Sequence, residues 1–417
     1  MEKSGKFRLT SLERNWILYD VGNSAFVLMV ATLIPIFFNA LAAAGGLSSV
    51  EYLAYWGYAS SAVTIITAVL SPILGTVADT KGFKKPIFIL CVFVGIVGCC
   101  AMGAVSAWLP FLVIFVIAKV GFSGSLVFYD SMLSDVTTPE RMDEVSSRGY
   151  AWGYIGSCVP FVVCLGLVLG AGSIGISQMT ALNLALLLTA AWWLLTTLPL
   201  LKSYKQLYYV EVEKHAVRQS FARIGHTLRH LPEDKQVFWF LLAFFCYIDG
   251  VYTIIDMATA YGTALGLDTT GLLLALLVTQ IVAFPSALVF GRLSNKYPSA
   301  KLIPVCIAAY AGIAVFAFFL TRQWQFWVLA VIVGMFQGGV QALSRSHFAK
   351  IIPPEKSGEY FGLFDICGKG ASFLGTMIVS VGSQLTGSAN VGVGSLILLF
   401  IVGFVLFRVS FRQGETV

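Results

Sequence analysis

The first candidates for chemistry are polar residues in the middle of a long apolar run, residues 238–261. This run reads FWFLLAFFCYIDGVYTIIDMATAY. On a helix, Asp249, Thr253 and Asp256 fall at positions i, i+4 and i+7, so one hydroxyl and two carboxyls share one stripe of an otherwise apolar helix. A carboxyl in the interior of a bilayer is energetically costly. We therefore expect the stripe to face protein or water, where it can bind a solute or a proton.

Four other apolar runs carry polar stripes of the same kind. In chain order they hold Asp20, Asn23 and Ser24; Lys119, Ser123, Asp130 and Ser134; Gln337, Gln341, Ser344 and Arg345; and Asp365, Lys369, Ser372, Thr376 and Ser380. At about 1.5 Å per residue, depth in the bilayer separates the charged members. Those near the midplane are Lys119, Asp249 and Lys369. Those toward one face are Asp20, Asp130, Arg345 and Asp365, whereas Asp256 lies toward the other.

The midplane charges are the first candidates for binding. A carboxyl removed from water can exchange a proton near neutral pH, so Asp249 is the expected proton carrier, with Asp256 or Asp20 as second choices. Lys119 or Lys369 is expected to bind an anionic group such as a carboxylate. One cation beside one carboxyl suits a zwitterion. The uncharged members of the expected binding set are Asn23, Gln337 and Gln341.

The charges nearer the membrane face have two interpretations. They either contribute to binding or form a charge network between helices that closes an inner gate. For Asp130 with Arg345, which lie at equivalent positions of an internal repeat, both interpretations stay open. Asp365 and Lys369 are four residues apart and can pair locally, so ligand contact by Lys369 is also left open.

The composition requires helices that cross a membrane. The 417 residues are 58% hydrophobic and only 12% charged, against roughly a quarter charged in soluble domains. Long, uniformly apolar runs predict helices and exclude a transmembrane barrel. Twelve spans are expected, near residues 16–43, 53–78, 87–107, 109–136, 149–172, 178–201, 237–261, 271–294, 301–321, 326–348, 360–384 and 391–410. The fold class is therefore an all-α polytopic membrane protein.

The basic residues predict the orientation. Of 27 Lys and Arg residues, 24 fall on the side of the termini, Arg322 falls on the other side, and Lys119 and Lys369 lie inside helices. By the positive-inside rule both termini are cytoplasmic, which in a bacterium means the inner membrane. This topology accounts for the net charge of +6 without a nucleic-acid partner. The first run has span length, so we expect an uncleaved first helix and no signal peptide.

Two six-helix units with a linker between them are predicted: residues 1–201, 202–236 and 237–417. Apolar residues recur at helical spacing within the linker, which predicts an amphipathic helix on the membrane surface; a disordered linker is the alternative. The end of the second span, PILGTVADTKGFKKP, and that of the eighth, PSALVFGRLSNKYPSAK, share positions at one offset. Such parallel repeats are typical of secondary transporters.

The eight cysteines lie inside apolar runs without metal-ligand spacing, so we expect packing residues and no metal site. We expect no cofactor. The sequence lacks a nucleophile elbow, an HExxH motif and a phosphate-binding glycine loop, which argues against an enzyme and an ATP-driven pump.

The loop GTVADTKGFKKP resembles the signature loop between the second and third helices of the major facilitator superfamily, with Gly75, Asp79, Gly82, Lys84 and Lys85 at the family's positions. The resemblance implies two six-helix repeats and a gating and packing role for these residues. The corresponding loop GRLSNKYPSAK departs from the signature, because Asn295 stands where the acid is expected.

Three further segments, YDVGNSAF (19–26), FYDSMLSDVTTPER (128–141) and RGYAWGYIGS (148–157), resemble the branch that contains autophagy-linked vacuolar amino-acid effluxers and their bacterial relatives. The branch implies a secondary transporter of small polar solutes, amino acids above all, working by alternating access with protons as the coupling ion. The expected partners are the substrate, protons and the lipid bilayer, and we expect a monomer. The alternatives are a drug or metabolite exporter of the same fold and a sensor that does not transport.

Overall fold

The computed structural model describes residues 7–211, 225, 227 and 229–414, without the side chains at 49–50, 53, 259–260, 263–264, 269–270, 273 and 369–373. The helices before the linker are α1 (Ser11–Ala31), α2 (Leu33–Ala44), α3 (Ser49–Ala78), α4 (Lys84–Met102), α5 (Trp108–Ser131), α6 (Leu133–Val136), α7 (Met142–Leu169) and α8 (Gln178–Ser203). Those after it are α10 (Lys235–Ala264), α11 (Thr269–Leu293), α12 (Ser299–Phe318), α13 (Gln323–Ile351), η1 (Pro354–Lys356), α14 (Ser357–Thr386), α15 (Ala389–Gly394) and α16 (Ile397–Gly414).

Side chains that bind backbone amides fix several helix starts. The Thr10 hydroxyl accepts a hydrogen bond from the Glu13 amide at 3.1 Å, and the Glu13 carboxylate accepts one from the Thr10 amide at 2.7 Å. Ser48 and Glu51 repeat this capping box at the start of α3. The start of α14 differs, because Lys356 at its N-cap position makes no side-chain cap bond. The first amides of α14 therefore need partners from elsewhere in the fold.

The first predicted span, residues 16–43, consists of two helices. Thr32 separates α1 from α2 with φ −130° and ψ −74°. Pro35, in the first turn of α2, has no amide hydrogen to donate to the carbonyl of Ala31, and its ring crowds the preceding turn. The prediction of one continuous helix is therefore wrong. The two helices together still form one span, Ser11–Ala44.

The predicted all-α membrane fold is confirmed. Among the described residues, 11 helical stretches are long and apolar enough to cross a bilayer. α14 is not among these stretches, because the side chains of residues 369–373 are outside the described part of the chain. It has 30 residues and packs against α3 and α10. With α14 added to these 11 stretches, the number of membrane-spanning helices agrees with the predicted twelve.

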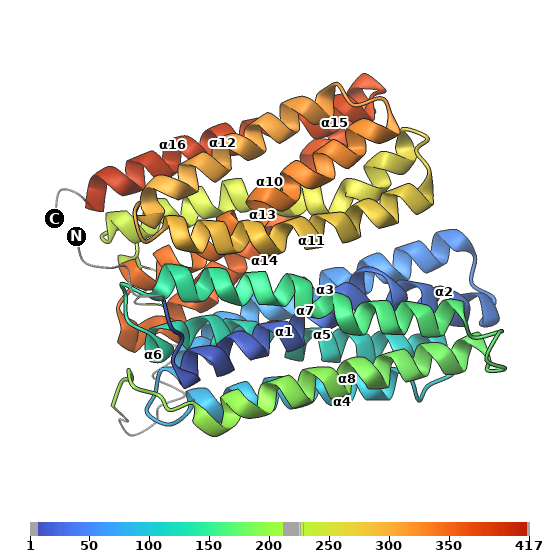
Figure 1. Cartoon of the computed structure of the whole chain (residues 1–417), viewed down its shortest axis with the longest axis horizontal. Helices are drawn as coiled ribbons and strands as arrows, with labels where there is room; N and C mark the ends of the chain where they lie inside the picture. The colour runs from blue at the N-terminus through green and yellow to red at the C-terminus, as the bar shows by residue number, and fades with distance from the viewer. Residues whose placement is uncertain (1–6, 212–224, 226, 228, 415–417) are drawn as a thin grey trace.

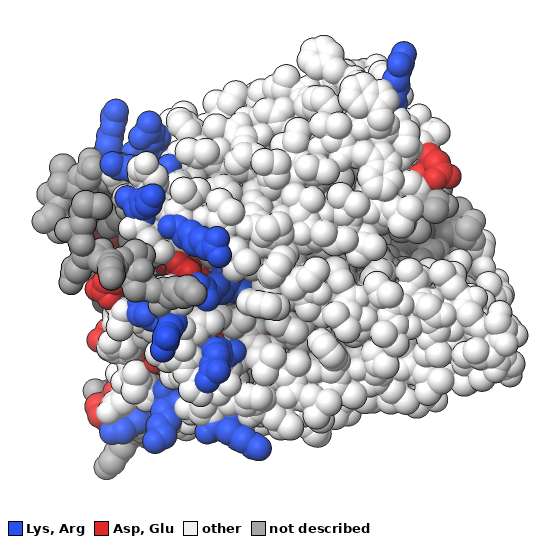
Figure 2. All heavy atoms as spheres, viewed as in Figure 1, with Lys and Arg blue, Asp and Glu red and all other residues white. Residues whose placement is uncertain are grey.

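The helices form two groups that meet near one end of the molecule. α1–α8, here called the first half, lie together in the lower part of Figure 1, and α10–α16, the second half, lie in the upper part. The start of α1 and the end of α16 lie at the same end, here called the termini end, and Figure 2 shows Lys and Arg side chains gathered there. α3 packs against α14, and α7 packs against α11 and α13. Toward the opposite end the helices of the two halves diverge (Figure 1).

The start of the linker is held against the loop between α3 and α4. The Val210 amide donates to the Asp79 carbonyl at 2.8 Å, and the Lys81 amide donates to the Val210 carbonyl at 3.1 Å. The Gln206 side chain bonds to backbone groups of the same loop. The predicted amphipathic helix falls largely on residues 212–224, outside the described residues. The predicted domain boundaries remain a prediction.

Candidate functional site

A buried arginine joins the two halves. Arg345, on α13, is 2% exposed. Its Nη1 donates to Asp130 Oδ1 of α5 at 2.9 Å, and its Nε and Nη2 donate to the hydroxyl and the carbonyl of Ser146 on α7 at 2.9 and 3.0 Å. The Asp20 carboxylate of α1 lies 3.7 Å from the same Nη1. These partners offset the cost of burying the guanidinium charge.

Aromatic rings enclose the Arg345 guanidinium. The ring centroids of Trp16, Tyr129 and Tyr150 lie 4.7, 5.4 and 4.3 Å from its Cζ atom. The face of an aromatic ring attracts a cation, and more strongly where water is excluded. Gly149 permits the close approach, because a Cβ atom there would lie 3.1 Å from Arg345 Nη2.

The residues of the first half that surround the guanidinium are here called the arginine box: Trp16, Asp20, Tyr129, Asp130 and Tyr150. Asp20 is a predicted binding residue, and Asp130 has two predicted roles, binding and gating; both carboxylates lie beside Arg345. Trp16, Tyr150 and Ser146 are not among the predicted site residues. The spacing of Ser146 and Tyr150, four residues apart on one helix face, is a signal that could have found those two.

A second network, the Asp79 network, joins the end of α3 to the start of α14. The two carboxylate oxygens of Asp79 accept hydrogen bonds from the amides of Gly358 and Glu359 at 2.7 and 2.8 Å. Asp79 is fully buried. A carboxylate of the first half thus completes the first turn of a helix in the second half, where the helix dipole favours negative charge.

Lys84 extends this network to the linker. Its buried Nζ donates to Ser357 Oγ at 2.8 Å and to Asp135 Oδ2 at 3.4 Å, and lies 3.9 Å from Asp79 Oδ1. Asp135 also accepts from the Tyr204 hydroxyl at 2.6 Å and from two linker amides at 2.9 Å. Burial, reinforced by the negative charge of Asp135, raises the pKa of the Tyr204 hydroxyl well above its ordinary value, so this hydroxyl remains a donor.

The other predicted residues of the signature loop have separate positions. Gly75 lies against Gly358, and a Cβ atom on Gly75 would overlap the Gly358 carbonyl. Gly82 has φ +79°, a left-handed conformation that glycine adopts without strain. Lys85 is half-buried. The two glycines therefore serve close packing and a tight turn.

The boundary of α7 with α13 and with the end of α11 has its own polar contacts. The Asn295 amide group donates to Glu144 Oε2 at 2.6 Å. Asp143 pairs with Lys350 Nζ at 2.6 Å and accepts from the Ser346 hydroxyl at 2.6 Å. Asp143 and Glu144 are not among the predicted site residues. Two adjacent acids shortly before the predicted span 149–172 were the available signal.

Asp249 is fully buried between α10 and α14. Its Oδ1 accepts from the Gly375 amide at 2.9 Å and from the Thr253 hydroxyl at 3.3 Å. Its Oδ2 has no hydrogen-bond partner among the described residues. A Cβ atom on Gly375 would lie 2.7 Å from Asp249 Oδ1, so only glycine leaves room for the carboxylate here. Asp256, the other acid of the predicted stripe, is exposed.

The two predicted cations near the midplane lie on different halves. Lys119 is half-buried on α5, with Nζ 4.7 Å from the Phe122 ring centroid and 6.0 Å from that of Phe26. The side chain of Lys369 lies outside the described residues, as does any pair that it forms with Asp365. Asp365 accepts from the Ser71 hydroxyl at 2.8 Å, a further bond between the halves.

The predicted amides are all buried. Asn23 donates to the Tyr19 carbonyl at 3.1 Å and to Asp20 Oδ1 at 3.4 Å, so it adjoins the arginine box. Gln341 accepts from the Tyr154 hydroxyl at 2.7 Å across the boundary between the halves. Gln337 lies one turn away, and its carbonyl oxygen has no partner in the described part of the chain.

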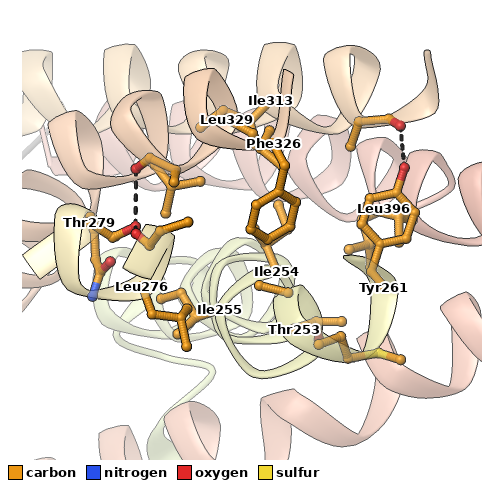
Figure 3. Close-up of a pocket in the computed structure, with 18 of the residues that line it drawn as sticks. Thr253, Ile254, Ile255, Tyr261, Leu276, Thr279, Ile313, Phe326, Leu329 and Leu396 are labelled. Carbon is orange, nitrogen blue, oxygen red and sulfur yellow. Dashed lines mark hydrogen bonds between the residues drawn. The ribbon is translucent and has the colours of Figure 1, made fainter. Parts of the chain in front are cut away.

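A pocket with about 710 Å³ of empty space, part of which is open to the outside of the chain, lies in the second half among α10, α11, α12, α13, α14 and α15 (Figure 3). Its walls are mainly apolar and include Ile254, Tyr261 and Phe326. Thr253 and Gln337 contribute polar atoms to the lining, which holds no charged residue among those described. Such a lining suits an apolar group with hydrogen-bond donors rather than an ion.

The described hydrogen bonds and ion pairs between the halves lie toward the termini end. They connect Ser71 to Asp365, Asp79 to Gly358 and Glu359, Lys84 to Ser357, Asp143 to Ser346 and Lys350, Glu144 to Asn295, Ser146 to Ala342, Tyr154 to Gln341, and Arg345 to Asp20, Asp130 and Ser146. Such contacts can break and form together without any chemical reaction. Among the described residues, no group of three His, Cys, Asp or Glu residues could hold a metal ion.

Comparison with known families gives one match over nearly the whole chain. The family described as "Vacuole effluxer Atg22 like" matches residues 11–140 and 134–416. An uncharacterized MFS-type transporter, YxiO of Bacillus subtilis (strain 168), is 42% identical over 414 residues, which cover 98% of this chain and 96% of that protein.

Fungal proteins and solved structures are more distant. Autophagy-related protein 22 of Coccidioides immitis (strain RS) is 25% identical over 315 residues, covering 65% of this chain and 51% of the fungal protein, so the matched region spans about half of that relative. The crystal structure of the human organic anion transporter MFSD10 (TETRAN) superimposes with a TM-score of 0.72 at 14% identity, covering 95% of this chain and 99% of that chain. This likeness shows a shared fold.

Proposed function

The chain belongs to the Atg22-like branch of the major facilitator superfamily and is an MFS-type transporter, and on this premise we propose that it moves amino acids across a membrane by proton-coupled alternating access. The observation that carries the proposal is the concentration of polar contacts between the halves at the termini end. These contacts are reversible, so the halves can separate there and close at the opposite end.

The gathering of basic residues at the termini end supports a cytoplasmic location for that end. On this assignment the structure represents the conformation closed toward the cytoplasm. Opening it requires removal of Arg345 from the arginine box and of Asp79 from the first turn of α14. Both steps separate buried charges from their partners. Solute or proton binding must therefore offset a sizeable free energy.

Asp249 is the proposed proton carrier. Three features support this role: the carboxyl is buried, only one of its oxygens accepts hydrogen bonds from described residues, and it lies on the first helix of the second half. Asp20 and Asp256 remain second choices. Lys119 and Lys369 are the proposed partners of the substrate carboxylate, with Asn23, Gln337 and Gln341 as the proposed neutral contacts.

A drug or metabolite exporter is the second candidate function. The apolar lining of the cavity in Figure 3 favours it, because an exporter of drugs needs a large, weakly polar site. The Lys119 ammonium argues mildly against cationic drugs.

Uptake by the purified protein in liposomes tests the proposal. We expect saturable uptake of a common amino acid that a proton gradient stimulates, and loss of this stimulation in Asp249→Asn. Asp268→Asn is the matched control, because Asp268 also accepts a backbone amide bond, from Gly271 at 2.7 Å, but is exposed.

A full response to the gradient in Asp249→Asn would refute the coupling role of Asp249. If Lys119→Gln and Lys369→Gln both leave the affinity for the solute unchanged, the carboxylate site is elsewhere. If no amino acid accumulates while an apolar drug does, the exporter is the correct function.

A further inference from the structure

The arginine box is a complete cation site built by the first half alone. Three ring faces and the two carboxylates of Asp20 and Asp130 come from α1, α5 and α7. The cation, Arg345, comes from α13 in the second half. The contacts that hold it are therefore present in the first half whether or not the second half supplies a guanidinium.

The guanidinium does not use all the hydrogen-bonding capacity of the box. Arg345 donates to Asp130 and twice to Ser146, whereas Asp20 Oδ2, 3.7 Å away, has no hydrogen-bond partner of good geometry among the described residues. The buried Tyr129 hydroxyl faces Asp20 and also has no such partner in the described chain. Asp20 Oδ2 and the Tyr129 hydroxyl thus lie close to each other and to the cation without a hydrogen bond of good geometry, which leaves capacity for a further donor.

We propose that the arginine box is a binding site for the primary ammonium or guanidinium group of an organic solute, which replaces Arg345 when the halves separate at the termini end. This inference rests on the proposed function, because the box is buried until the halves move. An ammonium group has three N–H donors, which match the two carboxylates and the Tyr129 hydroxyl. The ring faces then stabilise the bound cation as they stabilise the guanidinium.

Competition between the solute and Arg345 follows from this arrangement. The tethered guanidinium is present at a high effective concentration, so it closes the termini end when the box is empty. A bound cation prevents this closure. After the solute leaves, Arg345 returns and restores the conformation seen here. The same side chain is thus both the link between the halves and the competitor of the ligand.

Binding of methylguanidinium chloride to the purified full chain tests the proposal. In Arg345→Ala the box is vacant, and we expect methylguanidinium to raise the unfolding temperature saturably, with a half-saturating concentration at least 10-fold lower than for the wild type. Methylammonium is expected to act similarly, and sodium chloride at equal ionic strength is the control. This lowering of the half-saturating concentration should disappear in the double variant Arg345→Ala/Asp130→Asn. Arg322→Ala, at the opposite end, is the matched arginine control and should behave as the wild type.

Equal responses of Arg345→Ala and the wild type would overturn the proposal, as would a full response in the double variant. If Arg345→Ala does not fold, Arg345→Gln keeps most of the side-chain length and takes its place. In the wild type, methylguanidinium should also lengthen the distance between spin labels at positions 140 and 296, on opposite halves of the termini end. An unchanged distance at saturation would refute the competition.

These outcomes are separable from the proposed function. If methylguanidinium binds as described but no amino acid is transported, the proposed cation site is supported and the proposed substrate is wrong. If amino acids are transported but neither methylguanidinium nor methylammonium binds to the arginine box, the transport function is supported and the proposed cation site is wrong.

Discussion

Replacing Asp79 by asparagine should open the termini end. The two Asp79 oxygens accept the Gly358 and Glu359 amides at 2.7 and 2.8 Å, and Lys84 lies 3.9 Å away. Asparagine keeps the shape and one acceptor oxygen. It loses the negative charge, and its NH₂ group cannot accept the second amide.

The expected magnitude follows from these bonds. A hydrogen bond to a charged group contributes about 1.5–3 kcal/mol, against about 1 kcal/mol for a neutral one. Asp79→Asn removes one hydrogen bond to a charged group and weakens the other. The Lys84 ammonium keeps its hydrogen bonds to Asp135 and Ser357. Burying an amide costs less than burying a carboxylate, which offsets part of the loss. We expect the closed state to lose about 2 kcal/mol, or roughly 30-fold in the ratio of closed to open molecules.

Distances between spin labels measure this ratio. The exposed residues Glu140 and Lys296 lie in loops of different halves at the termini end and can carry labels as cysteines, once the eight native cysteines are replaced. Asp79→Asn should transfer population to a longer distance. Asp268→Asn, which removes the negative charge from an exposed helix cap within one half, is the control and should leave the distances unchanged.

Two results would contradict the reasoning. An unchanged distance distribution in Asp79→Asn would mean that the carboxylate does not stabilise closure. The same shift in the Asp268→Asn control would mean that the distances report general destabilisation and not the boundary between the halves.

Three further substitutions test other contacts. Asn295→Asp places a second carboxylate beside the Glu144 carboxylate that the Asn295 amide now contacts at 2.6 Å, so the closed state should lose about 2 kcal/mol by like-charge repulsion, and the same labels should report a longer distance. Gly375→Ala would overlap the side chains packed against it and should lower the unfolding temperature by several degrees, whereas Gly312→Ala, in open space on α12, should not lower it; equal effects would contradict this packing. Tyr204→Phe removes a donor from the buried Asp135 carboxylate and should cost about 2 kcal/mol of stability in thermal or denaturant unfolding, while an unchanged stability would show the bond to be dispensable.

The sequence was sufficient for the fold because the apolar runs leave few alternatives. Spans of about 20 residues and the uneven distribution of Lys and Arg predict twelve helices, and the structure agrees. The break at Thr32 was missed, because Pro35 lies in a run that is uniformly apolar on both sides. Hydropathy measures length and does not register a lost amide hydrogen.

The candidate site was only partly accessible from the sequence. Helical periodicity can place Asp130 and Arg345 on polar faces, but which helices face each other depends on packing. The positions of Trp16 and Tyr150 around the guanidinium therefore required the structure. Asp249 illustrates the reverse case. Its burial was anticipated, whereas its bond to the Gly375 amide was not, because a backbone amide inside a helix is normally already bonded.

The first turn of α14 depends on Asp79 of the other half, because Lys356 at its N-cap position makes no side-chain cap bond. Without Asp79, the amides of Gly358 and Glu359 lack the partners that they have in the closed state. The first turn of α14 is then free to fray, and fixing each residue again costs about 1–2 kcal/mol of conformational entropy. On the proposed mechanism, separation of the halves would in this sense include a local unfolding event. Hydrogen exchange at these two amides would therefore count how often the transporter opens.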